Sequence, residues 1–273
     1  MNNPHQPNRH SVLSVLKRPV LIDIFKYLVV VAAVTWFMIN GTRQLGYNWQ
    51  WYRVPQYIIA SADSQPVPGP LIQGLLITIR ITAISLVLAF IFGLTSALMR
   101  LSRSFLARAI ARGYLEIIRN TPLLVQLFLI YFVLSPVFNI SGFASAVLTL
   151  SLFEGAYASE IFRAGIVSIH REQWEAAFSI GLNTYQTYRL IILPQALRRI
   201  LPPLTSQAVS LIKDSALVST IAIYDLTMRG QVIIAETFLV FEIWFTVAAI
   251  YLTITLVLSA AVFYMEKRLK VVT

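Results

Sequence analysis

The sequence predicts an all-α, polytopic bundle of six transmembrane helices, and its composition supports this class. Apolar residues make up 57% of the 273-residue chain, whereas charged residues make up only 12%. A soluble domain of this length covers one core with a charged surface, and this chain has too few charges to do so. The apolar residues also gather in runs of about 20, the length that crosses the hydrocarbon core of a bilayer as a helix. We therefore expect an integral membrane protein in contact with lipid.

Six apolar runs follow one another along the chain. A basic tail with Lys17 and Arg18 precedes the first run, as it would in a cleavable signal peptide. No small-residue cleavage site follows this run, so we expect it to remain as a helix. A proline-rich linker separates it from the next five runs. The six expected spans are residues 20–39, 78–98, 118–134, 143–161, 203–223 and 240–264.

The distribution of lysine and arginine supports this count. Cytoplasmic connections of membrane proteins carry an excess of these residues. One set of alternate connections contains 17 of the 22 basic residues, whereas the opposite set contains 3. Both termini are therefore expected in the cytoplasm. The expected divisions are a cytoplasmic tail (1–19), an additional first helix (20–39), an external linker (40–70), a core of five spans (71–265) with a long cytoplasmic loop (163–199), and a second cytoplasmic tail (266–273).

Several classes of function are disfavoured by the residues. The net charge of +10 does not indicate nucleic-acid binding, because the basic residues are scattered between apolar segments instead of gathered on one face. The chain has no cysteine and its three histidines lie far apart, so we expect no metal site. It also lacks the Gly-x-x-x-x-Gly-Lys-Ser/Thr loop that cradles nucleotide phosphates. We therefore expect no catalytic residue and no cofactor in this chain.

The cytoplasmic loop 163–199 is the most informative stretch, because it is long and yet keeps helical periodicity. It contains Glu175-Ala176-Ala177, then Gly181 and, further on, Leu193-Pro194. Two short helices that meet at Gly181 would project from the membrane as a compact knob, and small alanines would allow a partner to approach closely. The alternative is an ordinary amphipathic helix at the membrane interface. The several fixed positions in one loop favour the knob.

This spacing resembles, position by position, the signature loop of binding-protein-dependent ABC importer permeases. The resemblance extends over about residues 70–267 and narrows to the permeases for polar amino acids. The sequence departs from the family pattern at Asn120, Glu172 and Ala216, where Gly, Gly and Ser are usual. The first helix is additional to the family's core of five spans. The segments that match are 119, 121–128, 155–157, 160–161, 163–166, 191–196, 211–214 and 241–242.

The resemblance implies a permease subunit of a bacterial inner membrane that forms the translocation pathway for an amino acid. It also implies a second permease, identical or homologous, an external solute-binding protein, and two ATPase subunits that bind ATP and Mg²⁺. The chain itself would hydrolyse nothing. The ATPases are expected to dock on Glu175, Ala176, Ala177, Gly181, Leu193 and Pro194. Two alternatives are an ion-driven secondary transporter, in which internal repeats are usual, and a membrane scaffold subunit that does not transport.

Ionisable residues inside the spans are the candidates for substrate contact, because a charge in the membrane is costly to bury. Glu154 lies halfway along the span 143–161, and Tyr157 shares its helix face. Arg80 lies in the outer part of the second span. Glu154 and Arg80 could face the ammonium and carboxylate groups of an amino acid. The alternatives are that Arg80 extends to the outer headgroups and that Glu154 makes a structural hydrogen bond.

Other residues indicate structural pairs and boundaries. Lys213 and Asp214 are expected to form an ion pair that serves gating or helix packing. Glu160 and Arg163, three residues apart, are expected to pair locally near the inner surface. The pair Pro202-Pro203 predicts that the cytoplasmic helix stops there and that the next span begins.

Overall fold

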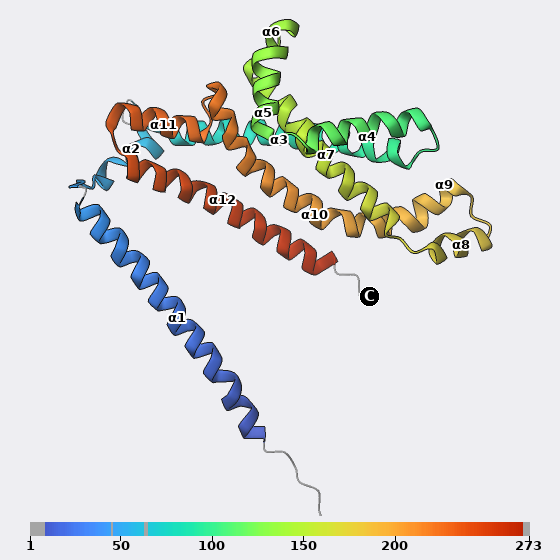
Figure 1. Cartoon of the computed structure of the whole chain (residues 1–273), viewed down its shortest axis with the longest axis horizontal. Coiled ribbons are helices and arrows are strands. Elements are labelled where there is room, and N and C mark those ends of the chain that lie inside the picture. Colours follow the sequence, from blue (N-terminus) through green and yellow to red (C-terminus); the bar gives the residue numbers. More distant parts are fainter. Residues whose placement is uncertain (1–8, 45, 63–64, 270–273) are drawn as a thin grey trace, which may run out of the picture. The chain divides into compact units, whose positions relative to one another are not determined.

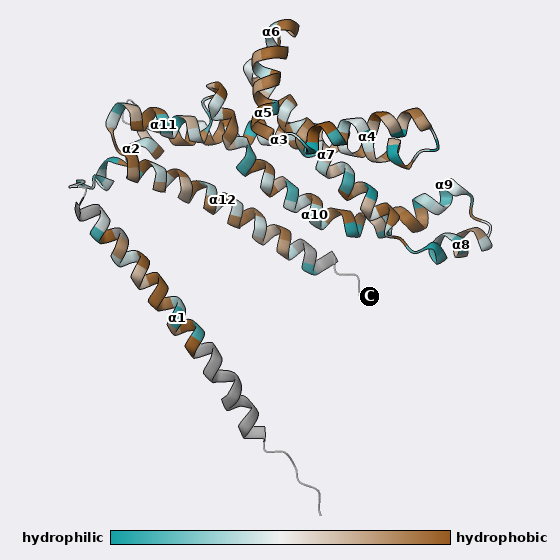
Figure 2. Ribbon diagram, in the orientation of Figure 1, coloured by the Kyte–Doolittle hydropathy of each residue, from teal (hydrophilic) through white to brown (hydrophobic). Residues whose placement is uncertain are grey.

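The computed structural model describes residues 9–44, 46–62 and 65–269 (Figure 1). The chain divides into two compact units, Met1–Trp49 and Gln50–Thr273. In the first unit, helix α1 (Arg9–Gln44) contains the apolar segment Ile22–Gly41, which is long and apolar enough to cross a membrane. Residues 20–39, the first predicted span, therefore lie within a helix, as expected. Large apolar side chains such as Phe25 and Trp36 are exposed, as expected for a helix that faces lipid. Figure 2 shows hydrophobic residues along the described part of α1.

The second unit begins with a short segment that the all-α prediction did not contain. Its elements are η1 (Trp51–Arg53), α2 (Pro55–Ile58) and two short antiparallel strands, β1 (Ile59–Ala62) and β2 (Gln65–Pro68). Prolines are tolerated in this hairpin because each edge strand has one side without a ladder partner. Such a short hairpin barely changes the amino-acid composition of the segment between the longer apolar runs. The sequence therefore predicted only a linker here.

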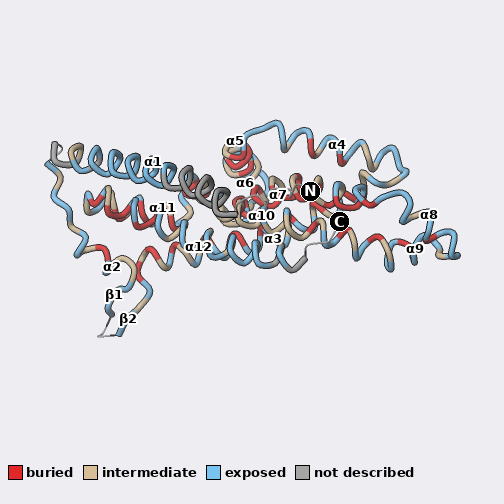
Figure 3. Tube along the Cα trace, turned by 90° about the horizontal axis from the view of Figure 1, so that it is seen from below, coloured by how far each residue is buried: buried red, intermediate tan, exposed pale blue. Residues whose placement is uncertain are grey.

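Four long helices form the body of the second unit. They are α3 (Pro70–Leu101), α7 (Gly142–Val167), α10 (Leu193–Asp214) and α12 (Val240–Leu269), and they run side by side in Figure 1. Small residues bring α3 and α7 into close contact, since a Cβ atom added to Gly93 would lie 2.7 Å from the Cβ of Ala158. Buried residues are frequent along α7 and infrequent along α4 (Phe105–Arg119), as Figure 3 shows.

A sharp bend interrupts the third predicted span. Helix α4 ends at Arg119, and an arm made of α5 (Leu123–Phe128), η2 (Leu129–Leu134) and α6 (Ser135–Phe138) leaves it at an angle of 106°. In Figure 1 this arm projects away from the long helices. The predicted start at residue 118 is therefore wrong by about one turn, because Pro122 cannot donate a backbone hydrogen bond and restricts the residue before it.

The loop predicted to be cytoplasmic consists of α8 (Arg171–Ser179), α9 (Thr184–Thr187) and the π-helical η3 (Tyr188–Ile192), which leads into α10. The two short helices predicted on either side of Gly181 are thus present. The boundary predicted at Pro202-Pro203 is wrong, because α10 continues through both prolines to Asp214. Ile200 packs so closely against Gly165 of α7 that no Cβ atom would fit there, and this contact holds α10 beside α7.

The last part of the chain consists of η4 (Ser215–Ile221), α11 (Leu226–Thr237) and α12. Among the described helices, three are long and apolar enough to cross a membrane, and five spans result if each of two bent pairs counts as one. The six predicted spans are therefore not confirmed, and the cytoplasmic placement of both termini stays a prediction. The additional predicted span corresponds to α7. Its many buried Ser, Gly and Ala residues and Glu154 lower its hydropathy, because α7 faces other helices more than lipid.

Candidate functional site

The turn between α8 and α9 follows from two residues of the loop. Gly181 has φ +83°, a conformation that favours glycine, and its N–H donates to the carbonyl of Phe178 at 3.0 Å. Asn183 then caps α9, because its Oδ1 accepts from the N–H of Gln186 at 2.9 Å. The side chain of Gln186 accepts in return from the N–H of Asn183 at 3.0 Å. One helix therefore ends and the next begins within four residues.

The predicted docking residues divide into one buried and five exposed positions. Ala177 is buried beneath the loop, whereas the others reach its surface: Glu175, Ala176, Gly181, Leu193 and Pro194. Glu175 is held by an exposed ion pair with Arg171, with 2.7 Å between Oε1 and Nε. The tip also exposes large apolar side chains, namely Phe178, Ile180, Tyr185 and Leu190. An exposed apolar patch with a polar rim is typical of a surface that binds another protein.

Polar contacts fasten this loop to the two long helices from which it projects. Arg199 of α10 donates from Nη1 to the carbonyl and to Oγ of Ser168, at 2.6 and 3.0 Å, at the end of α7. Gln195 donates to Gln173 of α8 at 3.2 Å. The ring of Trp174 lies edge-on to that of Tyr188, with centroids 4.9 Å apart. These contacts join the loop to the end of α7 and to the start of α10.

Glu154 lies in a small cavity between helices. Its side chain is only 1% exposed and borders a cavity of about 170 Å³ together with residues of α3 and α10, among them Thr205 and Gln207. Gln207 donates its Nε2 hydrogen to Oε2 of Glu154. In the described part of the chain, no N–H or O–H group donates to Oε1 of Glu154, whose carboxyl group also interacts with that of Asp214. A buried carboxylate oxygen without a partner is free to accept a hydrogen bond from a ligand.

The other two predicted substrate residues lie away from this cavity. Tyr157 contacts Phe153, with ring centroids 5.1 Å apart, and the guanidinium carbon of Arg119 lies 5.8 Å from its ring centroid. Arg80 is exposed and lies over the ring of Phe143, 5.5 Å from its centroid. The structure therefore does not bring Arg80, Tyr157 and Glu154 together. Sequence reasoning missed Gln207, although an amide within a predicted span was a usable signal.

Lys213 and Asp214 also point in different directions. Within the described residues no ion pair joins them, because consecutive residues of an α-helix project about 100° apart. Lys213 instead borders a second cavity of about 240 Å³, together with Ser206, Ser210 and Ser259. Asp214 interacts electrostatically with Glu154. The two residues therefore form no direct salt bridge in the described structure, although their charges attract each other.

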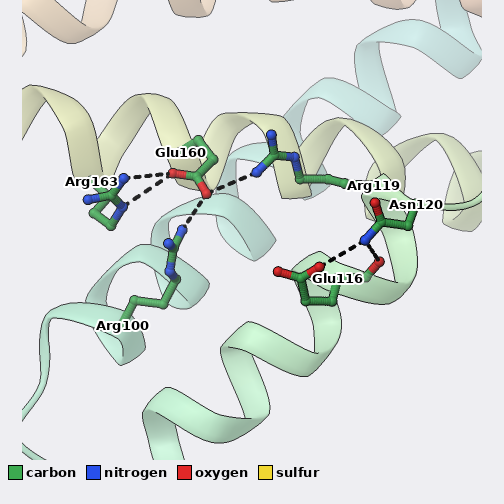
Figure 4. Close-up of polar contacts among 6 residues, drawn as sticks. All are labelled: Arg100, Glu116, Arg119, Asn120, Glu160 and Arg163. Carbon is green, nitrogen blue, oxygen red and sulfur yellow. Dashed lines mark hydrogen bonds and ion pairs between the residues drawn. The ribbon is translucent and has the colours of Figure 1, made fainter.

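The predicted pair of Glu160 and Arg163 is present, and it is part of a larger cluster (Figure 4). Glu160 Oε2 accepts from Arg163 Nη2 at 3.0 Å. Its other oxygen, Oε1, accepts from Nη1 of Arg100 at 2.7 Å and from Nη1 of Arg119 at 3.1 Å. One carboxylate therefore joins the ends of α3 and α4 to α7.

The chain is similar to a known protein family, to named relatives and to a solved structure. The family model described as "Binding-protein-dependent transport system inner membrane component" matches residues 89–271. A glutamine transport system permease protein of Escherichia coli K12 is 42% identical over 204 residues, which cover 74% of this chain and 93% of that protein. An L-cystine transport system permease protein of Bacillus subtilis is 42% identical over 199 residues, covering 72% and 85%. A solved amino acid ABC transporter has 38% sequence identity and a TM-score of 0.69, covering 73% of this chain and 94% of that chain.

Proposed function

Because the chain belongs to the family of binding-protein-dependent transport system inner membrane components, it is a membrane permease subunit, and we propose that it imports polar amino acids. The observation that carries the substrate class is the 42% identity to a permease named for glutamine, over 93% of that protein. The permease named for L-cystine agrees with it. An ion-driven transporter or a scaffold subunit gains no support from these relatives.

Two ATPase subunits would supply the energy, one to each permease of an identical or homologous pair in the bacterial inner membrane. They would bind ATP and Mg²⁺, while an external solute-binding protein would deliver the amino acid. The exposed apolar residues around Gly181 support the tip of the α8–α9 loop as the docking surface. Because Arg199 and Gln195 tie the loop to its helices, a displacement of the loop would move α7 and α10 as well.

The cavity beside Glu154 is the proposed contact for the amino acid. The unpartnered Oε1 of Glu154 would accept hydrogen bonds from an ammonium group, while Gln207 holds the other oxygen in place. A cavity of about 170 Å³ suits a single amino acid better than a peptide. Arg80 and Tyr157 lie outside this cavity, so the geometry supports Glu154 alone among the three predicted residues.

The proposal is tested by purifying the permease with its ATPase in nanodiscs and measuring ATP hydrolysis with a panel of amino acids on the cognate binding protein. We expect stimulation by a few polar amino acids. Gly181→Asp should abolish both ATPase binding and stimulation, whereas Gly113→Asp should retain them. At both glycines an added Cβ would have no neighbouring atom within 4 Å, although only Gly181 has a positive φ. An ATPase that fails to co-purify, or that ignores Gly181→Asp, would contradict the proposed docking site.

A further inference from the structure

Glu160 joins residues from three helices that are distant in the sequence. Arg100 lies in the last turn of α3, Arg119 is the last residue of α4, and Glu160 lies in the second half of α7 (Figure 4). The side chain of Glu160 is 27% exposed and that of Arg100 is 19% exposed, so both are partly shielded from water. Such shielding and the short distances make these charge-assisted contacts stronger than ordinary surface pairs.

The position of Glu160 along α7 connects this cluster to the cytoplasmic loop. Ser168, which Arg199 fastens to α10, follows Glu160 by eight residues, or about 12 Å along the helix. No break occurs in α7 between the two residues. A displacement of the loop therefore reaches Glu160 through one continuous helical segment.

On the other side of the cluster, Arg119 stands at the bend that directs the α5–α6 arm. The bend is held by Gln126, whose Nε2 donates to the carbonyls of Ile118 and Thr121 at 2.7 and 3.0 Å. Asn120 adds a bond from Nδ2 to the carbonyl of Glu116 at 2.8 Å. The arm then anchors its first residues, Leu123 and Leu127, in the buried core beside α3 and α7. Any shift of Arg119 therefore changes the direction of the arm.

We propose that Glu160 is a positioning residue that transmits movement of the α8–α9 loop from α7 to the end of α3 and to the α4–α5 bend. This inference rests on the proposed function, in which the loop is the ATPase docking site. The carboxylate holds three guanidinium groups that would otherwise repel one another. Arg100 and Arg119 lie on other helices, whereas Arg163 lies on α7 itself. Transmission therefore depends on the first two contacts and not on the third.

Glu116 provides a matched control in the same neighbourhood. It lies one turn before Arg119 and is exposed, and its Oε2 accepts a hydrogen bond from Nδ2 of Asn120 at 2.8 Å. Within the described chain Glu116 takes part in no ion pair. Neutralising Glu116 thus removes one negative charge next to the cluster but leaves the connection between helices intact.

The experiment measures ATP hydrolysed per amino acid transported by the complete complex in liposomes, with external binding protein. In Glu160→Gln, Arg100→Gln and Arg119→Gln we expect this ratio to rise about tenfold while the ATPase still co-purifies, a change within the usual range of coupling between sites. Glu116→Gln and Arg163→Gln should keep the ratio of the unmodified complex. Glu160→Asp, which retains the charge on a shorter side chain, should lie between these two results.

An unchanged ratio in Glu160→Gln, or an equal rise in Arg163→Gln, would overturn the inference. If Glu160→Gln does not accumulate as a folded protein, Arg100→Gln carries the same test, because it removes only one of the contacts between helices. A different result would contradict the proposed function itself. In that case the unmodified permease would bind no ATPase or show no amino-acid-dependent ATP hydrolysis.

Discussion

The backbone N–H of Gln50 donates a hydrogen bond of 2.7 Å to the carboxylate Oε1 of Glu242, a residue 192 positions later in the chain. Glu242 is fully buried in the first turn of α12. The ring of Trp51 lies 6.4 Å from that of Phe245, one turn further along the same helix. The segment that precedes the hairpin is therefore fastened to the start of the last long helix.

Loss of this contact should destabilise the start of α12. We expect Glu242→Leu to lower the free energy of unfolding by about 1–3 kcal/mol, because it leaves the buried N–H of Gln50 without its acceptor. Thermal unfolding of the purified protein in nanodiscs measures this effect. The exposed Glu236 provides the control, and Glu236→Leu should change the melting temperature little. Equal melting temperatures for the Glu242 variant and the unmodified protein would contradict the prediction.

Alanine should have opposite effects at two exposed glycines. Gly181→Ala is expected to cost about 1 kcal/mol, because alanine rarely adopts the φ of +83° found there. Gly113→Ala, in the regular helix α4, should stabilise by about 0.5–1 kcal/mol, because it reduces the conformational entropy of the unfolded chain. Thermal unfolding reports both changes. Effects of the same sign would show that the turn between α8 and α9 does not need glycine.

Amino-acid uptake should depend on Glu154, which borders the cavity, and not on Arg80. We expect Glu154→Gln to raise the KM for amino-acid uptake at least about tenfold, which corresponds to about 1.4 kcal/mol of binding free energy. The reason is that the neutral amide gives up the charge-assisted bond to an ammonium group. Arg80→Gln should leave the KM unchanged, since Arg80 lies over Phe143 and outside the cavity. Uptake by proteoliposomes with increasing substrate measures both, and an unchanged KM in Glu154→Gln removes this residue from substrate binding.

The bend between α4 and α5 should depend on one amide side chain. Gln126→Leu keeps a similar volume but leaves the carbonyls of Ile118 and Thr121 without their donor, which should cost about 1–3 kcal/mol. Unfolding in nanodiscs tests this expectation, with the exposed Gln231→Leu on α11 as the control. If both variants unfold at the same temperature, the bend is held by Pro122 and packing alone.

Much of the architecture could be predicted because membrane helices have strong local signals. Apolar runs located α1, α3 and α12, and the spacing of residues 175–194 located the turn at Gly181. The predictions were weaker where a helix lies inside the bundle. Buried small residues make α7 less apolar than a span that faces lipid, and α10, which packs against Gly165, continues through two prolines. Neither effect can be seen in a window along the sequence.

In the candidate site, too, local features could be predicted from the sequence, whereas contacts between distant residues could not. The residues of the α8–α9 turn act on neighbours within a few positions, so the two short helices around Gly181 were predictable from the sequence, whereas their docking role stays a prediction. Glu160 and Arg163 were paired correctly for the same reason, since residues three apart share a helix face. Lys213 and Asp214 form no direct salt bridge, because consecutive helical residues diverge, and their predicted role in gating or packing stays a prediction.

The sequence alone determined that this chain is an apolar, helical membrane protein with two short helices around Gly181, because composition, helix periodicity and turn residues act over short distances. Its likeness to a family of permeases supplied the function. Only the tertiary structure decided which groups meet across helices. Arg100 and Glu160 are 60 positions apart, Glu154 and Gln207 are 53 apart, and Gln50 and Glu242 are 192 apart. Such contacts depend on how whole helices pack and rotate against one another, and no local pattern in the sequence records that arrangement.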